Sequence, residues 1–490
     1  MLVCLAVVGL RQGFGARRAD ATPPLVLAIV CAGVILASLD LFIVNVALPQ
    51  MARDFGAHGL GDLSWVLNAY AIVYASLLVL FGRLSERYPR EYGFLLGVAI
   101  FVAASGACAA ADSVGLLVAF RVVQAAGAAL MTPTSLGLIL ATAPAERRAG
   151  SVRAWTAVGG MAAALGPVAG GLLVAVSWRW VFIVNIPIGL IALAIGWLRL
   201  PRVAGHDTPS PDPLGAVLVT AGVAALTLGL VDGGGWGWAS TRTLATLVGA
   251  VVLLGLFGVH TARHRNPLID RALFASRSFA GASIIALLFS IAFGAMLLSR
   301  VLWAQDVWRW SALLTGLSIA PGPVMVPLVA LTLTGRLIKR IGPGAVIALG
   351  CAFFAGGAIW WALDVGLHPD YVGQMLGGML LTGIGVGLAL PTLMSTGTAA
   401  LPAHSLATGS AVVNMLRQIG LALGVAVLIA VLGTPHAPHA VLSAYRHGWL
   451  VIAGFSILAG IVGLGILTPG RQARGLAPDG LSASVAVPGK

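Results

Sequence analysis

One acidic residue and one basic residue stand in stretches that are otherwise strongly apolar. Asp40 lies in the run from Leu25 to Ala47, and Arg121 and Gln124 lie near the start of the run from Val114 to Leu140. A carboxylate in hydrocarbon is costly unless it is paired or protonated. Because arginine does not give up its charge, protonation of Asp40 would free Arg121 to find another acceptor. The pattern predicts a proton-coupling site of Asp40, Arg121 and Gln124, and a fixed ion pair that only locks helix packing is the alternative.

Small residues and one proline crowd the run from Trp155 to Val176. They are Gly159, Gly160, Gly166, Pro167, Gly170 and Gly171. Spacings of three and four let a neighbouring helix pack closely, and the proline removes a backbone donor and can bend its helix. The pattern predicts tight helix packing, with a gating role as the second interpretation.

A compact charged turn follows the run from Leu63 to Phe81. It reads Gly82-Arg83-Leu84-Ser85-Glu86-Arg87-Tyr88-Pro89-Arg90. Such a turn can hold two helix ends together and open when two halves of a protein rock. We expect a gating latch formed by Gly82, Arg83, Glu86, Arg87 and Arg90, and ordinary anchoring of a membrane helix by basic residues is the alternative.

Polar side chains also occur late in the chain, in the run from Leu406 to Leu432. They are Asn414, Arg417 and Gln418. They could line a cavity, satisfy a bent backbone or hold a substrate. Helix phase adds Phe42 and Asn45 as expected cavity-facing residues.

The composition indicates which elements position these residues. Of the 490 residues 59% are apolar and only 9% are charged, whereas about a quarter of the residues in a soluble globular protein are charged. Fourteen membrane helices of about 21 residues would use roughly 294 residues, which matches the apolar fraction. The sequence therefore predicts an all-α membrane protein embedded in the lipid bilayer.

Apolar runs bounded by charge, proline or glycine give fourteen expected membrane helices. They are 25–47, 63–81, 93–111, 114–140, 155–176, 181–198, 214–231, 244–259, 279–298, 312–333, 344–363, 372–393, 406–432 and 448–467. Several are rich in glycine, which in lipid permits close helix approach rather than predicting a break.

Basic residues favour one side of this arrangement. With the N-terminus inside, 21 of the 29 Lys and Arg residues fall on the cytoplasmic side, and Arg121 and Arg417 fall in the hydrocarbon. The six outside are Arg53, Arg179, Arg242, Arg300, Arg309 and Arg446. The bias predicts cytoplasmic N- and C-termini, so most of the net charge of +13 serves topology and no nucleic-acid partner is expected. Tryptophans near the outer boundaries are interpreted as an interfacial belt, namely Trp178, Trp236, Trp238, Trp303, Trp308 and Trp310.

The two halves of the chain contain an internal sequence repeat. Pro133-Thr134 matches Pro391-Thr392, and this alignment pairs Gly127 with Gly385 but sets Arg121 opposite Met379. Duplicated halves of this kind build the midplane sites of many secondary transporters. We expect an N-terminal cytoplasmic extension at 1–24, a six-helix bundle at 25–200, a linker with two extra helices at 201–278, a second six-helix bundle at 279–468 and a cytoplasmic tail at 469–490.

Several motifs of other protein classes do not occur in the sequence. No lysine follows a G-x-x-x-x-G stretch, so the chain lacks a nucleotide-binding P-loop, and no H-E-x-x-H is found. The four cysteines have no paired spacing, so neither a disulfide framework nor a zinc site is indicated. We expect no enzymatic activity, no cofactor and no metal, with the proton gradient as the driving force.

Taken together, the motifs resemble those of the fourteen-helix drug:proton antiporters of the major facilitator superfamily. Leu39 to Pro49 is similar to the family's first-helix motif, and Gly82 to Arg90 is similar to motif A. Arg121 to Gly127 resembles motif B, and Gly159 to Gly171 resembles the antiporter motif C. The resemblance spans about Leu25 to Thr468. The departures are Glu86 where Asp is usual, Pro89 and Ala125 where Gly is usual, and Glu91 where a basic residue is usual.

The resemblance implies that Asp40 and Arg121 take part in proton coupling, that motif C marks export, and that motif A governs conformational change. We therefore expect a monomeric, proton-coupled exporter of amphipathic drugs or related small molecules in the plasma membrane. A dedicated exporter of one metabolite or antibiotic is the closest alternative, and a membrane sensor without transport is the other.

Overall fold

The computed structural model describes residues 23–56, 60–205, 212–399, 401, 406–435 and 437–467. The expected extension at 1–24, apart from Pro23 and Pro24, and the tail at 469–490 lie outside the described residues. Every long element of the described chain is a helix, because a backbone surrounded by lipid must satisfy its polar groups within its own segment.

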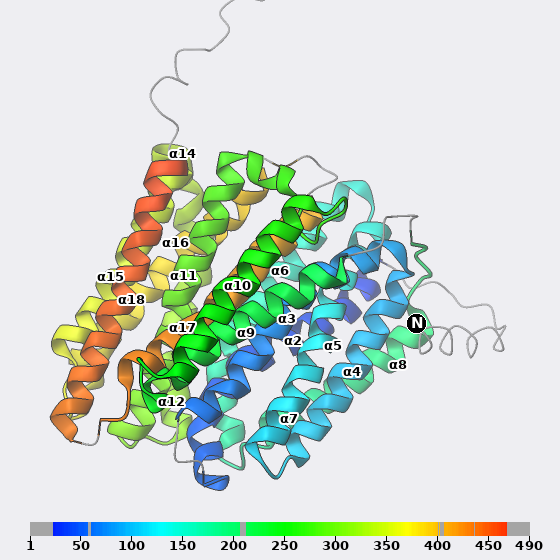
Figure 1. The fold of residues 1–490 in the computed structure, drawn as a ribbon. Coiled ribbons are helices and arrows are strands. Elements are labelled where there is room, and N and C mark those ends of the chain that lie inside the picture. The colour runs from blue at the N-terminus through cyan, green and yellow to red at the C-terminus, as the bar shows by residue number, and fades with distance from the viewer. Residues whose placement is uncertain are drawn as a thin grey trace, which may run out of the picture.

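The first bundle is formed by the N-terminal helices. They are α2 (Pro23–Asp54), α3 (Leu60–Arg87), α4 (Arg90–Ala110), α5 (Val114–Thr142), α6 (Ala145–Val174), the short α7 (Trp180–Ile183) and α8 (Asn185–Arg199). Helix α2 packs against α6, α3 and α4 pack against α5, and α8 covers α4 and α2. Figure 1 shows these helices, in blue to cyan, side by side in one half of the molecule.

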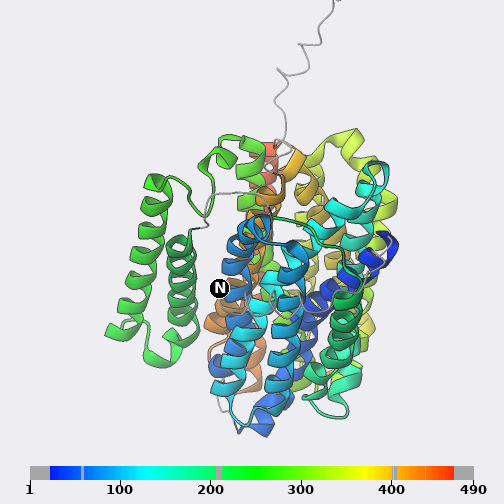
Figure 2. The same ribbon diagram turned by 90° about the vertical axis from the view of Figure 1, so that its right-hand side faces the viewer.

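Two helices follow as a hairpin, α9 (Pro213–Trp236) and α10 (Thr241–Arg263). They pack against each other, and α9 also contacts α3 and α17 (Leu406–Leu432). Figure 2 shows the hairpin on the flank of the molecule, beside the bundles. The large apolar side chains that α10 exposes are Leu244, Val248, Val251, Val252, Leu256 and Val259. This apolar outer face suits contact with lipid.

The second bundle begins after the 3₁₀ turn η1 (Arg271–Ala275). Its elements are α11 (Arg277–Leu302), η2 (Trp303–Val307), α12 (Ala312–Ile319), α13 (Pro321–Val329), η3 (Ala330–Thr334), α14 (Gly335–Ile341), α15 (Pro343–Asp364), η4 (Tyr371–Leu376), α16 (Gly377–Ala399), α17 and α18 (Pro438–Leu467). Helix α11 packs against α17 and α18, and α15 packs against α16 and α18.

The internal repeat has matched packing in the two bundles. A Cβ built at Gly127 would lie 2.7 Å from the Phe101 nitrogen, and a Cβ built at Gly385 would lie 2.7 Å from the Phe354 nitrogen. Such distances leave no room for a side chain, so α4 crosses α5 as closely as α15 crosses α16. The pairing of Gly127 with Gly385 in the sequence therefore corresponds to the same helix crossing in each half.

The described chain contains thirteen helices that are long and apolar enough to cross a membrane. Helix α6 adds a shorter apolar stretch, Val158–Val174, in the place of the fifth expected segment. The expected all-α membrane fold with fourteen helices is confirmed, and the chain is a multi-pass membrane protein.

Some residues assigned to the outer boundary are instead inside the protein. Trp178 and Trp303 are fully buried and Trp308 nearly so, whereas Trp238 is 49% exposed. Arg300, placed outside by the sequence analysis, is only 2% exposed. The interpretation of these tryptophans as one interfacial belt is therefore wrong for the buried ones, which belong to the packed core.

Candidate functional site

The structure brings Asp40, Arg121 and Gln124 together in the core of the first bundle. All three side chains have 0% exposure. Arg121 Nη1 donates a hydrogen bond to Asp40 Oδ2 within an ion pair and another to Gln124 Oε1, at 2.7 Å. Gln124 Nε2 donates to Asp40 Oδ1 at 2.9 Å. The intramembrane acid and base that the sequence singled out are therefore direct partners.

Two polar side chains that the sequence analysis did not select complete this network. Asn185, at the start of α8, donates from Nδ2 to Asp40 Oδ1 at 3.2 Å. Ser105, on α4, accepts from Gln124 Nε2 at 2.9 Å and donates to the Phe101 carbonyl at 2.8 Å. Asp40 Oδ1 thus accepts two amide N–H groups while Oδ2 accepts the guanidinium. Three helices, α2, α5 and α8, therefore meet at one carboxylate, and Ser105 of α4 contacts Gln124 and Asn185 beside it.

The guanidinium of Arg121 is held from the other side by α3. Its Nε donates to the Val66 carbonyl at 3.0 Å. Its carbon lies 4.1 Å from the centroid of the Tyr70 ring and 5.8 Å from that of Phe182. Aromatic faces attract a cation and keep water away from it, so the charge on Arg121 is stabilised without solvent.

The consequences for Arg121 differ between the two protonation states of Asp40. As a carboxylate, it neutralises Arg121; as a neutral acid, it leaves a buried guanidinium without its counter-charge. Removing one partner of a buried ion pair costs about 3–5 kcal/mol. A neutral Asp40 would therefore require a new acceptor or water at Arg121.

The glycines of the α6 helix place it against the helix that carries Asp40. A Cβ at Gly159 would lie 2.8 Å from Val34 Cγ1, and one at Gly166 would lie 2.7 Å from Phe42 Cβ. A Cβ at Gly170 would lie 2.9 Å from the Ile43 backbone oxygen, also on α2. The expected close packing is thus directed at the middle of α2.

The same helix also contacts the second bundle. A Cβ at Gly171 would lie 2.7 Å from the Ala312 oxygen, and one at Gly316 would overlap the Pro167 oxygen. Gln305 Nε2 donates across the interface to the Val46 oxygen at 3.1 Å. The end of the molecule at which α2 ends and α12 begins is therefore closed by backbone-to-backbone contact.

The expected charged turn is mostly helical: Gly82 to Arg87 form the end of α3, and only Tyr88 and Pro89 separate it from α4. These helix ends contact the chain on both sides of the α9–α10 hairpin. Arg83 Nη1 donates to the Pro267 oxygen at 2.6 Å, beyond the hairpin. Glu91 Oε2 accepts from the Val203 N–H at 3.0 Å, before the hairpin. Arg90 Nη1 donates to the Gly137 oxygen near the end of α5, at 3.1 Å.

The remaining expected members of the turn add local contacts. Ser85 Oγ donates to the Gly82 oxygen at 2.6 Å, and Arg87 is exposed at the end of α3. The side chain of Glu86 lies outside the described part of the protein. Glu91, where the family resemblance expects a basic residue, is fully buried, so this departure provides the acceptor for the linker backbone.

A small cavity lies between the two bundles, and two expected residues line it. Phe42 and Asn45 of α2 face Asn68 of α3, Leu297 of α11 and Leu421 of α17. Asn45 Nδ2 donates back to its own helix at 3.1 Å. The cavity volume is about 30 Å³, room for one water molecule, so a drug-sized ligand requires separation of the bundles.

The polar residues of α17 lie apart from the lining of this cavity. Arg417 Nη1 donates to Asn414 Oδ1 at 2.9 Å, and Asn414 Nδ2 donates to the Ser410 oxygen at 3.0 Å. Gln418 is mostly buried. Arg417 is close enough to Tyr74 of α3 to interact with it electrostatically. This group therefore lies where α17 faces the first bundle.

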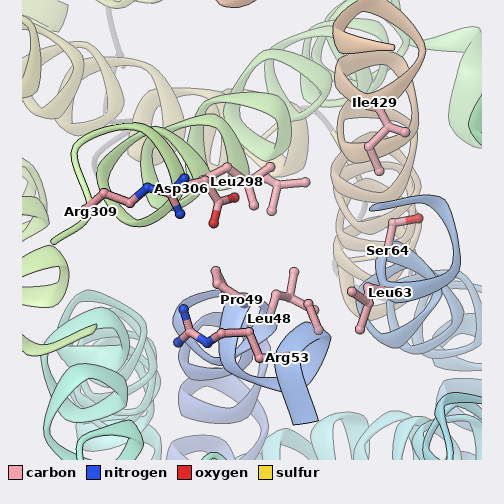
Figure 3. A pocket seen from close by; sticks show the side chains of 11 residues that line it. Leu48, Pro49, Arg53, Leu63, Ser64, Leu298, Asp306, Arg309 and Ile429 are labelled. Carbon is pink, nitrogen blue, oxygen red and sulfur yellow. The ribbon is translucent and has the colours of Figure 1, made fainter. Parts of the chain in front are cut away.

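A larger pocket of about 160 Å³ lies at the closed end of the interface. Figure 3 shows Asp306, beyond α11, with its carboxylate directed into the pocket, and Arg53 of α2 on the opposite wall. Arg309 also lines the pocket and adopts a positive φ of 57°, which is rare for a residue with a side chain. Arg53 and Arg309 were expected on the outer side of the membrane, and Asp306 was not expected at a site.

A polar cluster joins the two helices of the hairpin. Asp212 caps α9 by accepting from the Gly215 N–H at 2.9 Å, and His260 Nε2 lies 2.9 Å from the same oxygen. Burial raises the pKa of Asp212, but hydrogen bonds from Gly215, His260 and the Leu268 N–H more than offset it, so its pKa lies below the ordinary value. Together with His264, the side-chain atoms of this cluster that could serve as metal ligands lie within 4.8 Å of one another, whereas the sequence predicted no metal site.

Two repeated bundles around a closed interface, with a charged network buried in one of them, are the architecture of a membrane transporter. The sequence profile of the Major Facilitator Superfamily matches residues 30–425. The chain belongs to this superfamily, and the resemblance seen in the motifs is confirmed.

Curated relatives have names that describe drug and antibiotic export. The chain is 33% identical over 410 residues to the tetracenomycin C resistance and export protein of Streptomyces glaucescens, covering 83% of this chain and 75% of that protein. It is 32% identical over 468 residues to the cephamycin export protein CmcT of Amycolatopsis lactamdurans, covering 94% of each. It is 32% identical over 453 residues to the puromycin resistance protein pur8 of Streptomyces alboniger, covering 88% of each.

Solved structures show the same fold at lower sequence identity. The crystal structure of the POT family transporter PepTSo covers 90% of this chain and 97% of its own, with a TM-score of 0.66 and 16% identity. A second POT family peptide transporter, described as auto-inhibited, gives a TM-score of 0.66 and 17% identity, covering 90% of this chain and 96% of its own. These similarities support the fold alone.

Proposed function

We propose that the protein exports amphipathic drugs or related small molecules across the plasma membrane in exchange for protons, acting as a monomer with both termini in the cytoplasm. The observation that carries this proposal is the fully buried network of Asp40, Arg121 and Gln124. The export names of two relatives support the direction of transport. The bias of basic residues supports the orientation.

The packing suggests how the proton on Asp40 acts on the interface. Asp40 lies on α2, α2 packs along the glycines of α6, and α6 contacts α12 of the second bundle. In the proposed orientation, this contact closes the outer side. Protonation of Asp40 releases Arg121 and changes the seating of α2 in the first bundle, and α6 transmits this change to its contact with α12.

The lining of the small cavity indicates the class of substrate. Its described walls are aliphatic except for the Phe42 ring and the amides Asn45 and Asn68. No carboxylate is among the described lining residues. The lining favours neutral or singly charged amphipathic molecules over dications, because a second positive charge would find no counter-charge there.

A dedicated exporter of one antibiotic is the second candidate. It is favoured by the names of the tetracenomycin C and cephamycin export proteins, each of which refers to one compound or compound class. Susceptibility tests of a host that overexpresses the chain separate the two. Resistance to many unrelated amphipathic compounds supports broad export, and resistance to one class supports the dedicated exporter.

Transport into inside-out membrane vesicles tests proton coupling. We expect vesicles containing the protein to accumulate ethidium or puromycin when an acidic interior is established, and to lose this uptake when an uncoupler collapses the gradient. The Asp40→Asn variant should lose the pH-driven uptake. Asp112→Asn makes the same chemical change at an exposed position and should keep it. Uptake that survives the uncoupler would exclude proton exchange.

A further inference from the structure

The second bundle contains a buried arginine without a counter-charge. Arg300, near the end of α11, is 2% exposed. Among the described residues, no carboxylate lies within 4.0 Å of its guanidinium, and its Nε and Nη1 atoms have no hydrogen-bond partner. Buried guanidinium groups are ordinarily paired, because an isolated charge in a low-dielectric interior is strongly unfavourable.

The surroundings of Arg300 are aromatic and rich in unused donors. The guanidinium carbon lies 4.1 Å from the centroid of the Trp361 ring. One helical turn further along the chain, Trp303 packs against Trp449 with centroids 5.3 Å apart, and both indole N–H groups lack an acceptor in the described structure. This part of the bundle therefore has several buried donors and too few acceptors.

The first bundle contains a comparable buried arginine that does have a counter-charge. Arg121 lies at the same distance, 4.1 Å, from an aromatic ring, that of Tyr70, but it is neutralised by Asp40. The residue opposite Arg121 in the repeat is Met379, so the second bundle has no cation at that position; its buried Arg300 lies on its first helix, and no described carboxylate lies within 4.0 Å of it. Both arginines lie at the same distance from an aromatic ring, but only Arg121 has a carboxylate beside it among the described residues.

We propose that Arg300 binds a small monovalent anion of the chloride class through its Nε–H and Nη1–H groups. One negative charge balances one guanidinium and accepts donors that have no partner. Because Arg300 is only 2% exposed, a small ion fits beside its guanidinium more readily than an organic acid does. The anion is a resident counter-ion that stabilises the second bundle, and it is distinct from the transported substrate.

Thermal unfolding of the purified full chain in detergent tests this site. Sodium chloride is titrated against sodium gluconate at constant ionic strength, and the midpoint is followed by tryptophan fluorescence. We expect a saturable rise of a few degrees with chloride, since a ligand that binds only the folded state raises its stability with concentration. Bromide should act as chloride does.

Variants separate Arg300 from general salt effects. Arg300→Met should lose the chloride response and should unfold in gluconate at or above the wild-type midpoint, because it removes an unbalanced charge. Arg242→Met, an identical change at an exposed arginine, should keep the full response. If Arg300→Met does not fold, Arg300→Lys is the second variant. It retains the charge and should need a higher chloride concentration to give half of the rise in the unfolding midpoint.

Three results would overturn the proposal. The first is a wild-type midpoint that does not depend on chloride at constant ionic strength. The second is an equal chloride response in wild type and Arg300→Met. The third is a response to acetate with none to chloride, which would assign the donors to a carboxylate group instead of a halide-sized ion.

Discussion

Replacing Asp40 by asparagine removes one charge from a site at which three donors converge. Arg121, Gln124 and Asn185 all donate to the carboxylate, which offers two acceptor oxygens. Asparagine offers one oxygen and directs an NH₂ group at the donors. The substitution leaves Arg121 without its counter-charge, so we expect a destabilisation of about 3–5 kcal/mol.

A second substitution separates stability from coupling. Replacing Arg121 by glutamine in the Asp40→Asn variant removes the stranded charge, and we expect it to restore at least half of the lost stability. The double variant should still show no pH-driven uptake in inside-out vesicles. Asp112→Asn is the matched control, because it makes the same change on an exposed side chain.

Unfolding in denaturant and vesicle uptake together measure these effects. An Asp40→Asn variant within about 0.5 kcal/mol of wild type would show that the ion pair does not hold the bundle in the way its burial indicates. Recovery of pH-driven uptake in the double variant would refute the role of Asp40 as the proton-binding group and leave the fixed ion pair as its explanation.

Further predictions concern the bundle interface, the charged turn and the hairpin. Gly171→Val places a side chain against the Ala312 oxygen, so we expect the outer contact to fail to close and export to fall at least tenfold in efflux assays, with the protein still folded. Arg83→Gln removes the bond to the Pro267 oxygen and should slow transport while lowering stability by only about 1 kcal/mol in unfolding assays. Asp212→Ala should cost about 1–2 kcal/mol at neutral pH. Because the pKa of Asp212 is lowered in the folded protein, this difference should be fully present above about pH 3.9 and shrink as the pH falls through the lowered pKa, which unfolding at several pH values would measure.

The sequence was sufficient to select the central pair. A charged residue in an apolar run is rare enough to stand out, so Asp40 and Arg121 could be selected before their contact was known. Asn185 and Ser105 could not be selected in the same way, because neutral polar side chains are ordinary in glycine-rich membrane helices. Only the packing of α4 and α8 in the first bundle shows that Asn185 reaches the carboxylate and that Ser105 contacts Gln124 beside it.

Arg300 shows why the ends of the helices were harder to predict than their positions in the chain. The apolar run was expected to end at Leu298, which put Arg300 and Trp303 in the outer loop. The helix instead continues to Leu302 and then as a π-helix to Val307. Aromatic side chains from α15 and α18 cover this extension, so its polar residues are buried by neighbours that are distant in sequence.

The most direct test of the central claim is the release of protons when a drug binds to the purified protein. In weakly buffered detergent solution with a pH-sensitive dye, addition of puromycin or ethidium to the protonated wild-type protein should release a proton for each drug bound, and the Asp40→Asn variant should bind drug without release. Equal proton release from both proteins would contradict the claim that Asp40 carries the exchanged proton.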